Sequence, residues 1–297
     1  DFDRFVAARL PALAREHQLT AVYAYEDSAL HTFRAARALG LRCIYDLPIA
    51  YWETGRRLMQ EEAERLPEWA ATLGGGVTDS APKLARKTEE LALADMVVGP
   101  SSFVLDSLPD SAAGKKRVLT PFGSPPSTAD AARFEAPDAN RPLRVLFVGS
   151  MGQRKGLADL FAAMRLLKGQ PIELVVLGSL QESPEFYRRQ CEGLRHEKGR
   201  PHAQVLELMR SCDVFCLPSI VEGRALVTQE AMSQGLPIVI TANTGGADLV
   251  VEGKTGFLVP IRSPEKIAEK LAWFSDNRAE LPAMKAAAMR HAAGYTW

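Results

Sequence analysis

Short, continuous apolar runs in the second half of the chain constrain the fold most. The runs at 143–148 and 172–177 each end at a glycine, and a third run occupies 214–217. Strands buried on both faces lack polar alternation, and helical patterns separate these runs, so the order predicts a parallel sheet covered by helices. The other elements expected in this half are strands at 237–241 and 256–259 and helices at 157–168, from 184, at 203–210, at 226–233 and from 264.

The first half alternates extended and helical patterns less regularly. The segment 121–142 that follows it is rich in Pro, Ala and Asp and has no sustained period, which is typical of an interdomain linker. Ahead of this linker we expect strands at 20–25, 41–47, 95–99 and 117–120 and helices at 28–39, 52–66, 83–94 and from 101 or 102.

These patterns predict an α/β protein with two doubly wound, Rossmann-like domains that face a cleft. The amino-terminal domain, with the linker, is expected at 1–137 and the carboxyl-terminal domain at 138–297. Residues 1–17 read as a helix already under way, and the chain ends without an obvious closing element. We therefore expect the amino-terminal domain to lack its first elements.

Charge and cysteine content narrow the classes of partner. Lys plus Arg and Asp plus Glu each number 36, so a net charge of zero gives no electrostatic case for nucleic acid. Four scattered cysteines are too few for a disulfide framework and fit a reducing cytosol. Cys212 and Cys216 flank an apolar run, so we expect them to pack in a core rather than bind a metal. No apolar run approaches the roughly 20 residues of a membrane span, and no signal peptide is visible.

Three loops follow expected strand ends, at 149–156, 218–226 and 241–248. Such loops open on the carboxyl edge of a parallel sheet, where these sheets bind ligands. The first carries Arg154 and Lys155 just before a helix, which suits a phosphate or diphosphate because the cations and the helix dipole act together. A solvated basic turn is an equally open interpretation. The third loop either brings backbone groups to the same point or forms a plain turn, and neither a P-loop nor a GxGxxG pattern is present.

Two glutamates, Glu222 and Glu230, lie on the second loop and in the helix that follows, with seven residues between them. Gly223 allows close backbone approach, and the amides after it can bind an anion or a hydroxyl. A carboxylate can accept two hydrogen bonds from a vicinal diol, so Glu222 could bind sugar hydroxyls and Glu230 a ribose. Either glutamate taken alone is more simply a residue of a helix surface.

The loops and glutamates described above, together with the short sequence blocks around them, resemble the retaining glycosyltransferases of the GT-B fold, family 4. The resemblance is specific over 141–260 and looser over 20–118. It rests on the seven-residue spacing of the two glutamates and on several blocks that occur in the family's order. These blocks are FVGSMGQRKGL, LPS, EG, EAM, GLP and EGKTGFLVP.

The resemblance implies a hexosyltransferase-type enzyme that moves a sugar from a nucleotide-sugar donor to an acceptor hydroxyl and retains the anomeric configuration. The carboxyl-terminal domain would bind the donor, and the amino-terminal domain would bind a glycan, lipid or small-molecule acceptor. No metal and no cofactor are implied beyond the UDP-, GDP- or ADP-linked donor, since cationic side chains replace the metal. A cytoplasmic setting is implied, and peripheral contact with the inner face of the membrane is left open.

The resemblance also assigns roles to residues. Glu222 would lie over the donor sugar, Glu230 would bind the ribose, and His202 would lie near the base. Arg154 and Lys155 would bind the diphosphate and stabilise the charge on the leaving group. Glu222, Lys155 and Arg154 are thus the catalytic candidates, and no nucleophile is assigned. The other expected donor contacts are Gly149, Ser150, Gly223, Arg224, Ala225, Leu226 and Val227.

Three positions depart from the family's pattern. Ser150 stands where members often have arginine, so a phosphate contact is missing or Arg154 replaces it. Arg224 and Ala225 replace an aromatic and a small residue, which could alter the choice of donor. Tyr45 stands where many members have histidine, which puts a histidine-assisted step in doubt.

A catalytically silent GT-B protein or fragment that only binds nucleotide sugar is the alternative interpretation. The apparent lack of the first amino-terminal elements favours it, because donor binding would survive while catalysis fails. A GT-B epimerase or phosphorylase is a weaker alternative. The spacing of the two glutamates disfavours both, and the absence of an obvious pyridoxal lysine motif disfavours the phosphorylase.

Overall fold

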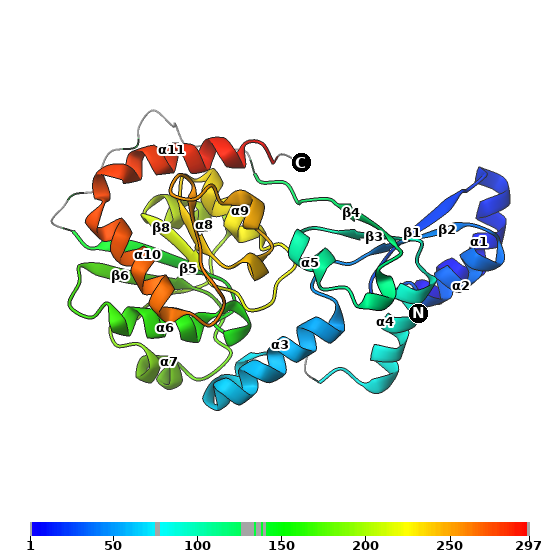
Figure 1. Cartoon of the computed structure of the whole chain (residues 1–297), viewed down its shortest axis with the longest axis horizontal. Coiled ribbons are helices and arrows are strands. Elements are labelled where there is room, and N and C mark those ends of the chain that lie inside the picture. The colour runs from blue at the N-terminus through cyan, green and yellow to red at the C-terminus, as the bar shows by residue number, and fades with distance from the viewer. Residues whose placement is uncertain (1, 75–77, 126–133, 135–137, 139–140, 296–297) are drawn as a thin grey trace. The chain divides into compact units, whose positions relative to one another are not determined.

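The computed structural model describes residues 2–74, 78–125, 134, 138 and 141–295. The chain divides into two compact units (Figure 1). The first contains Asp1–Gln60 and Gly75–Pro121, and the second contains Glu61–Gly74 and Phe122–Trp297. Most positions around the predicted boundary between 137 and 138 lie outside the described residues.

The first unit contains a parallel sheet in which each strand pairs with the next one along the chain, in the order β1-β2-β3-β4. Helix α2 packs against both α1 and α4, and Phe33 and Tyr45 meet edge to face in the core. The strands are β1 (Ala21–Tyr25), β2 (Arg42–Asp46), β3 (Met96–Gly99) and β4 (Lys116–Leu119). The helices are α1 (Phe2–His17), α2 (Leu30–Ala38), α4 (Ala81–Leu93), α5 (Ser102–Asp106) and the part of α3 (Trp52–Arg65) before Glu61.

The second unit contains a six-stranded parallel sheet in the order β10-β9-β8-β5-β6-β7. The chain runs outward from β5 in one direction and then from β8 in the other, which is the strand order of a dinucleotide-binding Rossmann fold. The predicted α/β class and parallel sheets are confirmed. The strands are β5 (Leu143–Val148), β6 (Ile172–Leu177), β7 (Arg195–Glu197), β8 (Val214–Leu217), β9 (Ile238–Ile240) and β10 (Gly256–Leu258).

Helices cover both faces of this second sheet (Figure 1). Helix α6 packs against α10, and α9 packs against both α8 and α11. All four residues of β8 are buried, as expected of a central strand with helices on both sides. The helices are α6 (Leu157–Leu166), α7 (Pro184–Gln190), α8 (His202–Arg210), α9 (Leu226–Ser233), α10 (Pro264–Asp276) and α11 (Leu281–Ala292).

The cysteine two residues before β8, Cys212, and the cysteine within β8, Cys216, lie in the core, as predicted. Cys212 is 1% exposed and Cys216 is fully buried. Burial raises the pKa of Cys212 to about 11 and that of Cys216 further, so both thiols stay protonated at neutral pH. They act as small apolar side chains.

Residues from the first half of the chain also belong to the second unit. They form the end of α3 and the short 3-10 helix η1 (Pro67–Thr72). Trp69 is 1% exposed, and its ring centroid lies 4.9 Å from that of Phe186 and 5.8 Å from that of Phe161. Edge-to-face contacts of this kind anchor the segment in the core of the unit.

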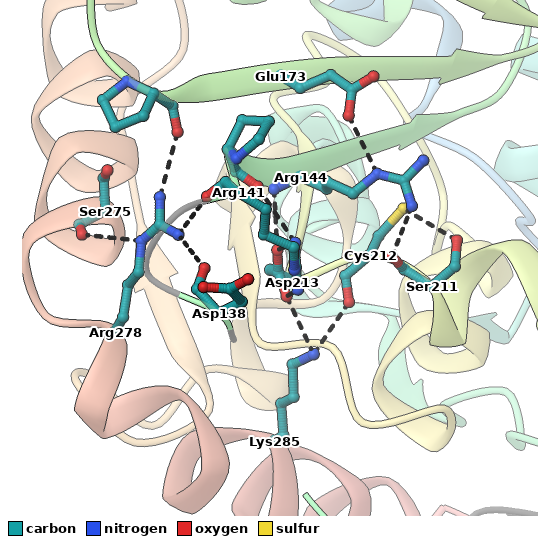
Figure 2. A network of polar contacts seen from close by, with 12 residues as sticks. Asp138, Arg141, Arg144, Glu173, Ser211, Cys212, Asp213, Ser275, Arg278 and Lys285 are labelled. Carbon is teal, nitrogen blue, oxygen red and sulfur yellow. Dashed lines mark hydrogen bonds and ion pairs between the residues drawn. The ribbon is translucent and has the colours of Figure 1, made fainter. Parts of the chain in front are cut away.

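A charge network lies at the amino ends of β5 and β8 (Figure 2). The buried carboxylate of Asp213 accepts two hydrogen bonds from Arg141, at 2.7 and 2.8 Å, and one from the backbone N–H of Arg144. Lys285 Nζ lies 3.4 Å from Asp213 and also donates to the carbonyl of Cys212. Burial alone would raise the pKa of Asp213, but these donors and the Lys285 charge hold the pKa below its usual value.

We expect Asp213→Asn to destabilise the folded chain by about 3 kcal/mol at neutral pH, because it leaves the buried Lys285 without its counter-charge. The pKa of Asp213 is lower in the folded state than the roughly 3.9 of an unfolded aspartate. Its contribution is therefore complete above about pH 4 and is lost as the pH falls through the folded-state pKa. Urea unfolding should show the full deficit at about pH 7, and the deficit should shrink as the pH is lowered from about 4 toward the folded-state pKa.

Glu173→Gln is the matched control, since this carboxylate pairs with Arg144 in the same network but is 29% exposed. It should cost well under half as much stability. Equal stability of wild type and Asp213→Asn at both pH values would contradict this account of the network.

Candidate functional site

The loops after β5 and β8 lie side by side, because these two strands are neighbours in the sheet. The direction of the chain's winding reverses between them. In open α/β sheets, ligands bind at the carboxyl ends of the strands on either side of such a reversal. The loops at 149–156 and 218–226, which the sequence singles out, therefore occupy the position where this fold binds ligands.

Two glycines let the first loop fold tightly. Gly149 has a φ of 153°, and a Cβ there would lie 2.6 Å from Cδ of Lys155. Gly156 has a φ of 73°, and a Cβ there would lie 1.9 Å from the carbonyl oxygen of Pro218. A side chain at either position would displace the lysine or separate the two loops. Between these glycines the chain forms the 3-10 helix η5 (Gln153–Lys155).

The three predicted catalytic residues are in direct contact. Arg154 Nη1 and Lys155 Nζ donate to the same oxygen of Glu222, Oε1, at 2.8 and 2.5 Å. Arg154 also donates to the carbonyl of Val221, and its own carbonyl accepts from Ile220 N at 2.9 Å. The side chains of Lys155 and Glu222 are 13% and 12% exposed. Two cations thus converge on one anion that lies close to the surface.

The third loop, 241–248, braces the second through its backbone. Glu222 N donates to Asn243 O, and Ala225 N donates to Thr244 O, each at 3.1 Å. Of the two interpretations left open for this loop, the structure shows the one in which its backbone groups reach the second loop. The N–H of Ala225, one of the predicted donor contacts, is taken up in this packing.

The side chain of Arg224 points into the protein. It is 1% exposed and forms two hydrogen bonds with Asp248, at 2.7 and 3.0 Å. It also donates to Gln229 Oε1 and to the carbonyl of Gly245. Burial alone would raise the pKa of Asp248, but the guanidinium holds the pKa below its usual value. Arg224 links the second loop to the third, so its guanidinium is not presented to a ligand.

Helix α9 begins at Leu226 directly after the second loop. Its N-cap, Ala225, provides no side-chain hydrogen bond, and first-turn N–H groups such as those of Leu226 and Val227 have no partner within a helix. Glu230 lies one turn further along, and its Oε1 is 3.1 Å from Nε2 of His202 at the start of α8. The structure thus brings the predicted ribose and base residues together.

Sequence reasoning missed several residues of this region. The hydroxyls of Ser219 and Thr228 are buried, and neither has a hydrogen-bond partner among the described residues. Ser219 lies in the loop after β8 and Thr228 in the first turn of α9, so both are candidate ligand donors. The LPS block marked the position of Ser219, but nothing in the local pattern distinguished either hydroxyl. Asp248 and Gln153 were also missed, although each lies in a loop that had been singled out.

Within the part of the chain that the structure describes, no three His, Cys, Asp or Glu side chains converge as a metal ion would require. None of the described helices combines the length and apolar character that crossing a bilayer requires. Arg154 and Lys155 supply positive charge at the candidate site.

The site's sequence matches a family description. Residues 129–291, more than half of the chain, match "Glycosyl transferases group 1". The chain belongs to the group 1 glycosyltransferases. The predicted resemblance is confirmed, and the matched segment contains β5, β8, α9 and every candidate donor residue.

Two curated relatives illustrate the group. The putative colanic acid biosynthesis glycosyltransferase WcaL of Salmonella typhimurium is 34% identical over 149 residues, which is 45% of this chain and 36% of the relative. The D-inositol 3-phosphate glycosyltransferase of Corynebacterium glutamicum is 32% identical over 167 residues, or 52% of this chain and 40% of the relative. The alignments thus span less than half of each relative's length.

Solved structures show the same fold. Alr3699/HepE of Anabaena, in complex with UDP, has a TM-score of 0.69 at 18% identity, covering 98% of this chain and 78% of its own. The sucrose-phosphate synthase of Thermosynechococcus elongatus has a TM-score of 0.68 at 18% identity, covering 98% of this chain and 73% of its own. These likenesses confirm the predicted GT-B fold class with its two Rossmann-like domains.

Proposed function

We propose that this chain is a retaining, metal-independent glycosyltransferase that moves a sugar from a nucleotide-sugar donor to an acceptor hydroxyl. The convergence of Arg154, Lys155 and Glu222 at the reversal point of the second sheet carries the proposal. Family membership supports the reaction class. The structure of Alr3699/HepE with UDP supports a nucleotide-linked donor.

The diphosphate is assigned to Arg154 and Lys155. Both cations contact one oxygen of Glu222, so the site concentrates two positive charges at one point. When the bond between the sugar C1 and the diphosphate oxygen breaks, the departing nucleoside diphosphate gains negative charge. Once they contact the diphosphate, the two donors stabilise that charge, which is the role a metal plays in other transferases.

Glu222 is assigned to the donor sugar. Its carboxylate lies on the loop after β8, beside the first turn of α9, where sugar hydroxyls can donate to it. For the sugar to bind there, the cations must transfer at least part of their contact from Glu222 to the diphosphate. The acceptor oxygen then bonds to C1 on the face that the diphosphate leaves, and the hydroxyl proton passes to the departing diphosphate oxygen. No covalent nucleophile is assigned.

The nucleoside is assigned to Glu230 and His202. Glu230 is 22% exposed on its side chain, and a ribose diol can donate to both of its oxygens. His202 is 59% exposed and supports Glu230 through its ring nitrogen. The acceptor is assigned to a sugar or sugar phosphate, as in the trehalose-phosphate synthase structure solved with glucose-6-phosphate. The four free cysteines fit the cytoplasmic setting that the proposal includes.

We expect Glu230→Ala to weaken binding of the preferred nucleotide by about tenfold, because two hydrogen bonds to the ribose are lost. It should leave the affinity for inorganic pyrophosphate unchanged, since pyrophosphate has no ribose. Calorimetric titration with UDP, GDP, ADP and pyrophosphate measures both effects. Glu192→Ala, which removes an exposed carboxylate of the same unit, is the control and should change neither affinity.

Selective binding of one nucleotide establishes the donor site, and transfer or slow hydrolysis of its sugar conjugate separates an enzyme from a silent binding protein. If none of the three nucleotides binds to the folded wild type, the proposed site is contradicted. Equal weakening of nucleotide and pyrophosphate in Glu230→Ala would place Glu230 at the phosphates rather than at the ribose.

A further inference from the structure

The residue directly before the two cations is completely buried and fully hydrogen-bonded. Nε2 of Gln153 donates to Glu62 Oε2 at 2.7 Å and to Asp159 Oδ2 at 2.8 Å. Its Oε1 accepts from the backbone N–H of Ala158 at 2.9 Å. Its own backbone N–H donates to Thr72 Oγ1 at 3.0 Å. Four hydrogen bonds to one side chain and its backbone amide leave the loop little freedom at this position.

Glu62 is a carboxylate with no exposed surface, and two arginines hold it. Its oxygens accept from Arg65 at 2.7 and 3.3 Å and from Nε of Arg262. Burial alone would raise the pKa of Glu62, but hydrogen bonds from Arg65 and Gln153 hold the pKa below its usual value. The group is therefore charged at neutral pH and accepts from Gln153 as a carboxylate.

Thr72 presses on the same loop from the backbone side. A Cβ at Gly152 would lie 2.4 Å from the carbonyl oxygen of Thr72, so the two backbones are in close contact. The Thr72 hydroxyl donates to Trp69 O at 2.7 Å, and Trp69 is buried in the core of the unit. The acceptor of the Gln153 N–H is thus fixed to a rigid part of the structure.

We propose that Glu62 and Thr72 are positioning residues of the donor site, which act on the diphosphate through Gln153 and never touch it. This rests on the proposed function. Both contacts fall on the residue before Arg154, so a displacement of Gln153 displaces the two cations with it. Misplacement of a binding group by about 1 Å can lower activity about a hundredfold, so a small shift of Gln153 can strongly change the reaction rate.

The proposal explains why residues 91 and 81 positions earlier in the chain belong to the donor-binding unit. If Glu62 and Thr72 served stability alone, their replacement would change the free energy of unfolding and leave the affinity for ligand unchanged. If they position the cations, their replacement would also displace Arg154 and Lys155 and weaken ligand binding. The two roles are therefore separable by experiment.

The test uses Thr72→Val, which removes the acceptor at constant volume, and Thr72→Ser, which keeps it. Glu62→Gln removes the charge at constant shape, and Glu64→Gln is its exposed control two residues along α3. We measure pyrophosphate affinity by calorimetry, hydrogen exchange of a peptide covering 152–158, and urea stability. Thr72→Val and Glu62→Gln should bind pyrophosphate about tenfold more weakly and exchange faster in that peptide, whereas Thr72→Ser and Glu64→Gln should match wild type.

Wild-type affinity and wild-type exchange in a folded Thr72→Val would overturn the proposal while leaving the proposed function intact. If Glu62→Gln fails to fold, the Thr72 pair still decides. If wild type binds neither pyrophosphate nor any nucleotide, the proposed function fails. The proposal that Glu62 and Thr72 position a donor site then also fails, whatever hydrogen exchange shows about the loop.

Discussion

Replacement of Lys155 by alanine is expected to weaken pyrophosphate and nucleotide binding by the same factor, about tenfold to a hundredfold. A charge-assisted hydrogen bond is worth about 1.5–3 kcal/mol, and each 1.4 kcal/mol is tenfold in affinity. The two factors should agree because the lysine is assigned to the phosphates alone. Calorimetric titration of both ligands into wild type and variant measures them.

Lys168→Ala is the control for this experiment. Lys168 is a cation of the same unit that is 82% exposed and pairs with Glu192, so its removal changes the net charge equally without touching the site. It should alter affinity by less than about twofold at physiological salt. An effect of Lys155→Ala no larger than that of Lys168→Ala would remove Lys155 from the diphosphate site.

Replacement of Glu222 by glutamine is expected to strengthen binding of pyrophosphate and to slow turnover. We expect Glu222→Gln to bind pyrophosphate about threefold to tenfold more tightly, because no carboxylate then competes for Arg154 and Lys155. We expect the same variant to release nucleoside diphosphate from the donor about a hundredfold more slowly, because the carboxylate assigned to the sugar is gone. Calorimetry gives the first quantity and initial rates of nucleoside diphosphate release give the second.

Glu222→Asp sharpens the interpretation. The shorter side chain keeps the negative charge but draws it back from the sugar, so turnover should fall while pyrophosphate affinity stays near that of wild type. A Glu222→Gln variant that binds pyrophosphate more weakly than wild type would show that Glu222 supports the phosphate site rather than competing for it.

The local sequence pattern was sufficient to predict the bounds of elements that are buried on both sides. The predicted bounds of the strands at 143–148, 172–177 and 214–217 and of the helix at 226–233 match the structure, because continuous apolar runs end abruptly at Gly or Pro there. Strand β7 was not predicted. It consists of Arg195, His196 and Glu197 at the edge of the sheet, and such a strand has no buried face to leave an apolar signature.

The contact among Arg154, Lys155 and Glu222 followed from topology. Once β5 and β8 are parallel neighbours, the loops after them must meet, and the charged residues of both loops lie at one edge. The inward turn of Arg224 did not follow, because its partner Asp248 lies 24 positions further along the chain in another loop. A guanidinium beside a presumed anion site reads equally well as a ligand contact until that partner is seen.

The network around Glu62 was beyond the reach of sequence reasoning. Residues 52–66 read as a charged helix, and the burial of Glu62 depends on Gln153, 91 positions away, and on Arg262, 200 positions away. Trp69 was the one local sign that this segment packs against something, since a large aromatic side chain in a charged region normally has an apolar partner.

The most direct test of the central claim is a crystal structure of the chain with the nucleoside diphosphate that it binds. We expect diphosphate oxygens within hydrogen-bond distance of both Arg154 and Lys155, the ribose hydroxyls on Glu230, and the Glu222 carboxylate released from at least one cation. A nucleotide bound elsewhere, with the contacts of Glu222 to Arg154 and Lys155 intact, would contradict it.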